Sequence, residues 1–177
     1  MIKQKKVGSI LNKFIPQGST IGIIGGGQLG QMMALDAKQT GMKVIILDPT
    51  PNCPAGQVAD EQIVAPYADT KAIEKLADKA DVLTYEFENV DLNALEDVQD
   101  RVYLPQGTNL LYTTKNRLRE KNFLRQAGVK TAPFMAVHTS AELKDAVKRI
   151  GYPAVLKTSE GGYDGHGQEV LRNKDDL

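Results

Sequence analysis

Residues 20–30 read Thr20-Ile-Gly-Ile-Ile-Gly-Gly-Gly-Gln-Leu-Gly30, and they set the fold class. The short apolar run Ile21–Ile24 predicts a buried strand. The glycines that follow, Gly25–Gly30, have the G-x-G-x-x-G spacing of a turn between a strand and a helix. Glycine suits such a turn because a Cβ would keep the backbone away from a bound phosphate or from a closely packed neighbour. The stretch therefore predicts the first strand–helix unit of a parallel sheet.

The helix expected over residues 28–40 begins an alternation of strands and helices. We expect it to end before Gly41 and to bury one stripe of side chains, Leu29, Met32, Met33 and Ala37. Further strands are expected over 43–48, 62–65 and 82–85, and further helices over 73–80 and 91–99. This alternation predicts an α/β fold with a doubly wound, Rossmann-like parallel sheet over residues 20–114, after an arm at residues 1–19.

The region from residue 115 to 177 has a different pattern. Helices are expected over 115–127 and 140–150, and strand-like segments over 133–138, 153–157 and 169–172. A glycine-rich loop over 161–167 lies between the last two strands and predicts a hairpin flap. We expect this region to be the beginning of an α+β domain that is cut short at Leu177.

Composition excludes several classes of protein. The 177 residues carry 22 Lys and Arg against 22 Asp and Glu, whereas a dedicated nucleic-acid binder usually has a basic excess. The single cysteine, Cys53, cannot form an internal disulfide, which favours a reducing compartment and an inert thiol. No apolar run approaches the roughly 20 residues of a membrane span, and the N-terminus lacks the apolar core of a signal peptide. We expect a cytoplasmic protein that binds neither nucleic acid nor a membrane.

The glycine turn allows two interpretations. Asp48 ends the second expected strand, where the acid of a dinucleotide site would bind a ribose hydroxyl. The pattern is therefore compatible with an NAD-dependent dehydrogenase. Alternatively, the glycines only allow the first helix to pack closely on the sheet.

Two acids follow the strand at 82–85. Glu86 and Glu88 stand at the carboxyl end of that strand, where open α/β sheets bind their ligands. Their spacing lets both carboxylates face a ligand amine or hydroxyl. They are equally compatible with solvated loop acids.

The densest signal is Gly161-Gly-Tyr-Asp-Gly-His-Gly-Gln168, with Lys157 on the strand before it. Four glycines suit a flap whose N–H groups fold over the phosphates of a nucleotide, and the lysine supplies a point charge. The alternative is a plain turn, although a turn needs only one or two glycines. On the preceding helix, Arg117 could reach an anion, whereas Arg119 and Lys121 are expected on a solvated face. His138 is expected to be structural, and a zinc site is not indicated.

Together these motifs resemble the 5-(carboxyamino)imidazole ribonucleotide synthases, the ATPase subunits of phosphoribosylaminoimidazole carboxylase, which belong to the ATP-grasp enzymes. The resemblance rests on Gly25-Gly-Gly-Gln-Leu-Gly30, Asp48-Pro49, Tyr85-Glu-Phe-Glu-Asn-Val90, Asn116-Arg-Leu-Arg-Glu-Lys121, Tyr152-Pro153, Lys157-Thr158 and the glycine-rich loop. It implies a pre-ATP-grasp domain over 20–114 and the start of an ATP-grasp domain over 115–177.

The resemblance also implies a function in de novo purine biosynthesis. Members of the family are carbon–nitrogen ligases that use MgATP and bicarbonate to carboxylate 5-aminoimidazole ribonucleotide, releasing ADP and phosphate. Family members are commonly homodimers. Because family chains continue past residue 177, we expect the Mg²⁺ ligands there, assign no metal ligand or catalytic side chain here, and expect this chain alone to be inactive. A non-catalytic nucleotide-binding module remains the other alternative.

Site residues are carried over from the resemblance position by position. The expected ATP contacts are Arg117, Lys157, Gly162, Tyr163, Asp164, Gly165, His166, Gly167 and Gln168. The expected contacts to aminoimidazole ribonucleotide are Gln28, Leu29, Glu86, Glu88, Tyr163 and Asp164, and the choice between the two glutamates stays open. Three positions depart from the family pattern: His166 replaces Lys or Arg, Asn116 replaces Asp, and Glu160 adds an acid beside the flap.

Overall fold

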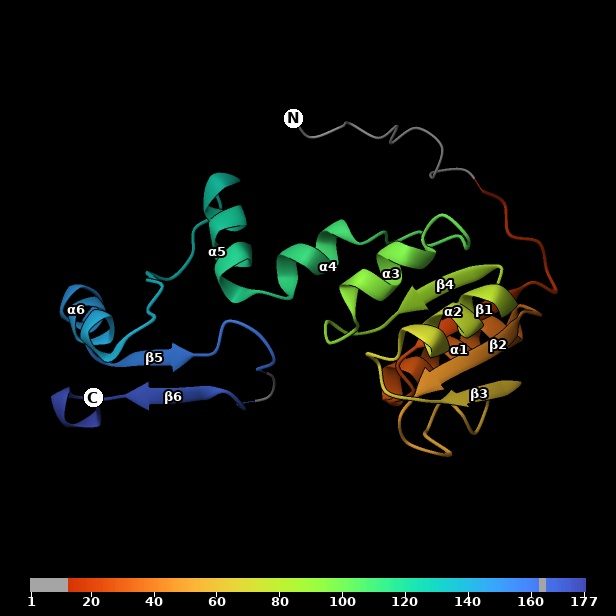
Figure 1. The fold of residues 1–177 in the computed structure, drawn as a ribbon, viewed down its shortest axis with the longest axis horizontal. Helices are drawn as coiled ribbons and strands as arrows, with labels where there is room; N and C mark the ends of the chain where they lie inside the picture. The colour runs from red at the N-terminus through yellow and green to blue at the C-terminus, as the bar shows by residue number, and fades with distance from the viewer. Residues whose placement is uncertain (1–12, 163–164) are drawn as a thin grey trace. The chain divides into compact units, whose positions relative to one another are not determined.

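The computed structural model describes residues 13–162 and 165–177. The chain divides into two compact units that meet at Leu110 and Leu111, and each unit is described by itself (Figure 1). The domain boundary expected after residue 114 stays a prediction. Most of the expected N-terminal arm lies outside the described residues. No helix among the described residues is both long enough and apolar enough to cross a membrane.

Unit 1 is built on a four-stranded parallel sheet. Its strands are β1 (Thr20–Ile24), β2 (Lys43–Asp48), β3 (Glu61–Val64) and β4 (Val82–Tyr85). Their spatial order is β3-β2-β1-β4, and all three pairings are parallel. The chain therefore starts in the middle of the sheet, moves outward to β3 and returns to the other side of β1 (Figure 1). This order confirms the doubly wound α/β prediction.

Two helices pack on the central strands. Helix α1 (Gln28–Gln39) buries Ala34 and Ala37 in a cluster with Ile23, Val44 and Ile46. Because successive side chains of a strand point to opposite faces, Gly22 faces away from this cluster. Helix α2 (Thr70–Lys79) packs there, with Leu76 so close that a Cβ at Gly22 would lie 3.0 Å from it. The sheet is thus covered on both faces.

The stripe that α1 buries differs from the expected one. Its buried residues are Gly30, Ala34 and Ala37, whereas Leu29 and Met32 are each 58% exposed. The reason is the close approach of the helix to the turn before it, since a Cβ at Gly30 would collide with the carbonyl oxygen of Gly25. Gly30 and Ala34 therefore replace Leu29 and Met32 in the buried stripe, while Ala37 is buried as expected and Met33 packs half-buried against the core cluster.

The last helix that lies wholly in unit 1 is α3 (Leu92–Val98). The next helix, α4 (Asn109–Thr114), spans the boundary between the two units and was not predicted from the sequence. Between them, the edge of β4 is covered. Leu83 N–H donates to the Tyr103 carbonyl, and the Gln106 side-chain amide bonds to both the N–H and the carbonyl of Tyr85. These contacts satisfy the backbone groups that an open edge strand would expose.

Unit 2 contains helices α5 (Arg117–Gln126) and α6 (Ser140–Ile150), strands β5 (Ala154–Lys157) and β6 (Gln168–Leu171), and a short 3₁₀ helix, η2 (Lys174–Asp176). The two strands pair antiparallel, with Lys157 opposite Gln168, so the expected hairpin is confirmed. The prediction of a strand over 133–138 is wrong, because that segment pairs with no strand among the described residues. It lies instead along the wall of a cavity that β5 also lines, without the hydrogen bonds that make a strand.

Candidate functional site

The glycine turn of unit 1 is shaped by close packing. Gly25 has a φ of 111°, a conformation that side chains rarely adopt. A Cβ at Gly26 would collide with the sulfur of Cys53 and lie 2.8 Å from the Cβ of Asp48. Helix α1 follows directly, and Gln28 and Leu29 are exposed on its first turn. Cys53 and Asp48 therefore pack against Gly26 of the turn, and the chain becomes exposed at Gln28 and Leu29.

Asp48 faces the turn instead of the solvent. One carboxylate oxygen accepts the Gly26 N–H at 2.7 Å and the Tyr67 hydroxyl, and the other accepts the Thr50 N–H at 2.8 Å. The side chain is only 5% exposed. An anionic phosphate brought to this turn would meet a carboxylate and an N–H that is already bonded. This geometry argues against the dinucleotide-binding interpretation, in which Asp48 would be free to bind a ribose.

The structure distinguishes Glu86 from Glu88. Glu86 is half-buried and lies against the glycine turn, because a Cβ built on Gly25 would be 2.9 Å from its Oε1 atom. Burial raises the pKa of Glu86, and the negative charges of Asp48 and Glu88 raise it further. Glu88 is exposed. Glu86 thus lies against the turn that leads into the exposed Gln28 and Leu29, and it offers an oxygen acceptor suited to a hydroxyl or an amine. We call the turn and these three residues the open patch of unit 1.

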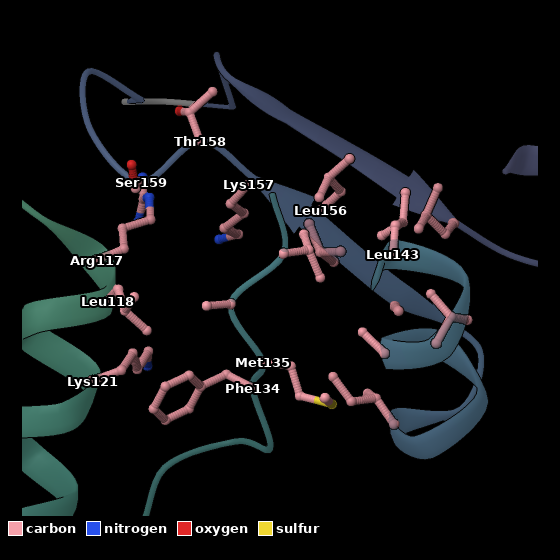
Figure 2. Close-up of a pocket in the computed structure, with 18 of the residues that line it drawn as sticks. Arg117, Leu118, Lys121, Phe134, Met135, Leu143, Leu156, Lys157, Thr158 and Ser159 are labelled. Carbon is pink, nitrogen blue, oxygen red and sulfur yellow. The ribbon is translucent and has the colours of Figure 1, made fainter. Parts of the chain in front are cut away.

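Unit 2 holds a cavity of about 530 Å³. Figure 2 shows Arg117, Leu118 and Lys121 of α5 on one side and β5 on another, with the Lys157 side chain directed into the space between them. Phe134 and Met135 come from the segment that was expected to be a strand. Leu143, Ala146, Val147 and Ile150 of α6 complete the apolar part of the lining.

Charge in this cavity has one sign. Arg117, Lys121 and Lys157 all line it, His138 joins them, and none of the lining residues is an acid. The remaining lining is largely apolar, including Phe134, Met135 and Leu156. An apolar cavity with converging cations suits a ligand that combines a flat apolar ring with an anionic tail.

Helix α5 is bonded to the base of the glycine-rich flap. The Arg117 N–H donates to the Ser159 carbonyl at 2.8 Å, and its guanidinium donates to the Gly162 carbonyl at 2.8 Å. Asn116 caps α5 through its side-chain oxygen, while its Nδ2 donates to Glu160 at 2.9 Å. An aspartate at position 116 could not make that donation. Asn116 and Glu160, two of the three departures from the family pattern, are therefore hydrogen-bonded partners.

The expected nucleotide contacts are brought together only in part. Arg117 and Lys157 line the cavity, and Gly162 lies in hydrogen-bond contact with Arg117. The other described flap residues, Gly165, His166, Gly167 and Gln168, are exposed and do not line it. Tyr163 and Asp164 lie outside the described residues. Their roles in binding, like those of Gln28, Leu29, Glu86 and Glu88, stay predictions.

Sequence reasoning missed four residues of the cavity. Lys121 was expected on a solvated face and His138 in a structural role, while Phe134 and Met135 were not singled out. Lys121 follows Arg117 by four residues, a spacing that places both on one face of a helix, so a signal was present. The other three come from an irregular segment without periodicity.

Metal-binding groups are scarce in the parts of the chain that the structure describes. Within residues 13–162 and 165–177, no three His, Cys, Asp or Glu side chains are grouped as a metal ion would require. Cys53 is buried, and burial raises the pKa of its thiol, which disfavours the reactive thiolate. The expected inert thiol agrees with this environment.

Comparison with protein families gives two matches along the chain. Residues 18–113 match the ribonucleotide synthetase preATP-grasp domain, and residues 122–177 match the ATP-grasp domain. The first match covers more than half of the 177 residues.

Individual relatives agree with these matches. The chain is 53% identical over 162 residues to the N5-carboxyaminoimidazole ribonucleotide synthase of Bacillus subtilis, covering 92% of this chain and 43% of the relative. A Staphylococcus aureus N5-carboxyaminoimidazole synthetase crystallised with ADP has a TM-score of 0.88 and 46% identity, again over 92% of this chain and 43% of the other. An Aspergillus clavatus synthase crystallised with ADP and 5-aminoimidazole ribonucleotide has a TM-score of 0.78 and 31% identity, over 90% and 42%. The chain thus spans under half the length of these relatives.

Proposed function

Because the chain belongs to the ribonucleotide synthetase preATP-grasp domain family, we propose that it provides substrate-binding parts of an ATP-dependent carbon–nitrogen ligase. The proposed reaction is the carboxylation of 5-aminoimidazole ribonucleotide by bicarbonate in purine biosynthesis. Support comes from relatives that are named as this synthase and from the ADP and aminoimidazole ribonucleotide held by solved structures.

The proposed reaction has two steps. A bicarbonate oxygen attacks the γ-phosphorus of ATP, which forms carboxyphosphate and releases ADP. The exocyclic amine nitrogen of the ribonucleotide then bonds to the carboxyl carbon, or to the CO₂ that carboxyphosphate releases, while phosphate leaves and the amine loses a proton. Charge accumulates on phosphoryl oxygens in the first step, so fixed cations and N–H groups assist it more than a nucleophilic side chain does.

One observation carries the proposal: three cations and no acid line an otherwise largely apolar cavity beside a glycine-rich hairpin. The apolar walls around Phe134 and Leu156 suit the adenine ring. Lys157, Arg117 and Lys121 then face the phosphates, and the glycines of the flap can bring main-chain N–H groups over them. We assign ATP to this cavity.

The open patch of unit 1 suits the other substrate. We assign aminoimidazole ribonucleotide to Gln28, Leu29 and Glu86, with Glu88 at the exposed margin. Glu86 offers a carboxylate to an amine or a ribose hydroxyl, and the buried Asp48 keeps a second negative charge nearby. Acids in this patch repel a phosphate, so the substrate phosphate is expected to point away from the turn.

Three further properties follow from the proposal. ATP enters such reactions as its Mg²⁺ complex, and the described residues contain no cluster of three His, Cys, Asp or Glu side chains that could hold the ion. A homodimer and a cytoplasmic location, where ATP is available, are proposed on the resemblance to the family.

The test is substrate-dependent ATP hydrolysis by the protein at its full natural length. We expect phosphate release to require both aminoimidazole ribonucleotide and bicarbonate, and Lys157→Ala to reduce it by at least tenfold. Binding of ATP without any turnover would favour a non-catalytic nucleotide-binding module. Reduction of NAD, with no protection by ATP, would contradict the ligase directly.

A further inference from the structure

Tyr67 connects two segments that border the glycine turn. It lies in the loop between β3 and α2, and its hydroxyl donates to the Asp48 carboxylate at the end of β2. Its ring packs edge-on against Phe87, with centroids 4.6 Å apart and planes at 66°. Phe87 directly follows Glu86. Tyr67 therefore contacts Asp48, which bonds to the turn, and Phe87, which directly follows Glu86.

The position of Glu86 depends on the same turn. The Asp48 bond to the Gly26 N–H fixes the middle of the turn from one side, and the Ala55 N–H donates to the Gly26 carbonyl at 2.9 Å from another. Glu86 lies against Gly25, the neighbouring residue. A shift of Asp48 would move Gly26 and thereby the surface on which Glu86 rests.

The charges around Glu86 also depend on Tyr67. The charged groups that face the Glu86 carboxylate are Asp48 from β2 and Glu88 from its own segment, both acids. The neutral Tyr67 hydroxyl and the Cys53 thiol lie on the Asp48 side of this cluster. No cation forms an ion pair with Glu86 within the part of the chain described here. By donating to Asp48, the Tyr67 hydroxyl draws off negative charge that otherwise repels the Glu86 carboxylate.

We propose that Tyr67 is a positioning residue for the carboxylation reaction, which holds Glu86 in place and in its ionised form through Asp48. The inference rests on the proposed function, because it assigns the aminoimidazole ribonucleotide to Glu86. Tyr67 touches no reacting atom in this account. Its effect is on binding of that substrate alone, since ATP is assigned to the cavity of unit 2.

The experiment compares Tyr67→Phe with Tyr85→Phe in the protein at its full natural length. Both variants delete one partly buried hydroxyl that donates a hydrogen bond, but the Tyr85 hydroxyl donates to the Gly107 carbonyl and not to Asp48. We expect Tyr67→Phe to raise the KM for aminoimidazole ribonucleotide about tenfold, the size typical for loss of a bond to a charged group. Tyr67→Phe should leave the KM for ATP unchanged, and Tyr85→Phe should change the KM of neither aminoimidazole ribonucleotide nor ATP.

The pH profile supplies a readout that a purely structural role would not move. If ionised Glu86 accepts from the substrate, kcat/KM for aminoimidazole ribonucleotide falls as the pH drops through the pKa of Glu86. Tyr67→Phe leaves more charge on Asp48 and raises that pKa, so the acidic limb moves to higher pH. Asp48→Asn removes the charge and moves the limb to lower pH, and this second variant keeps the test decisive if Tyr67→Phe folds poorly.

The inference is supported if the acidic limb of kcat/KM moves to higher pH in Tyr67→Phe and to lower pH in Asp48→Asn, with an unchanged KM for ATP. It is overturned if Tyr67→Phe behaves like Tyr85→Phe, or if Tyr67→Phe raises the KM for ATP together with the KM for aminoimidazole ribonucleotide. It is also overturned if the acidic limbs of Tyr67→Phe and Asp48→Asn lie at the same pH. A wild-type protein without turnover dependent on aminoimidazole ribonucleotide overturns the proposed function itself. Failure of the variants alone, with an active wild type, overturns only the role of Tyr67.

Discussion

Lys157 is the residue on which nucleotide binding depends most directly in this account. It stands at the end of β5, and its side chain points into the cavity of unit 2 (Figure 2). Lys157→Ala is expected to weaken ATP binding about tenfold or more, because it removes a cation whose side chain points into the cavity where we place the phosphates. Titration calorimetry measures the dissociation constant. Lys144→Ala, an exposed lysine of α6 outside the cavity, is the control and should leave it unchanged.

Asn116 and Glu160 can be tested as a pair. Asn116→Asp keeps an oxygen to cap α5 but replaces the donor to Glu160 with a second carboxylate. We expect faster amide exchange at the flap base, at Gly162, and weaker ATP binding, because the contact between α5 and the flap turns repulsive. Adding Glu160→Gln to Asn116→Asp should restore both. If the double variant is no better than Asn116→Asp alone, the two residues do not act together.

Single residues also show the limit of the sequence analysis. Glu86 and Glu88 are equivalent as sequence, two acids after a strand, and only the packing of Glu86 on Gly25 separates them. Tyr67 has no motif at all, since its contacts to Asp48 and Phe87 join segments far apart in the chain. Such contacts are set by tertiary packing and leave no local pattern.

At the scale of elements, the contact between α1 and the glycine turn is the most demanding. Gly30→Ala places a Cβ against the Gly25 carbonyl oxygen, a backbone atom that cannot move without disturbing β1. We expect a loss of about 1–3 kcal/mol in the free energy of unfolding, the usual cost of overpacking. Urea denaturation measures it. Gln39→Ala on the exposed end of the same helix should change stability by less than about 0.5 kcal/mol, and an equal loss in both variants would contradict the packing argument.

The elements differ in how far sequence could predict them. The strands β1, β2 and β4 are largely apolar runs, which predict buried strands, and the strand–helix alternation predicts that they pair in parallel. The burial of Gly30 and Ala34 in α1 could not be predicted by seeking large apolar residues, because the close approach of the helix to the glycine turn selects small ones there, whereas Ala37 is buried as expected. The segment 133–138 has the composition of a strand but no ladder partner among the described residues, and composition cannot supply one.

For the molecule as a whole, charge separates the two proposed substrate sites. At the patch of unit 1, Asp48 and Glu88 add negative charge around Glu86, whereas the cavity of unit 2 is lined by three cations and no acid. The net charge of zero hides this separation completely. An amine or hydroxyl suits the first site and a polyphosphate the second, and we propose that each unit selects a different substrate by electrostatics.

We propose that adenine nucleotide binds in unit 2 and not at the glycine turn, although that turn has the residue spacing of a dinucleotide site. Amide hydrogen exchange of the protein at its full natural length, with and without MgATP, tests it most directly. We predict slower exchange in β5, at Gly162, over Gly165–Gln168 and at the start of α5, with no change from Ile24 to Gln31. Slower exchange across Gly25–Gly30, with the β5–β6 hairpin unaffected, would contradict the account.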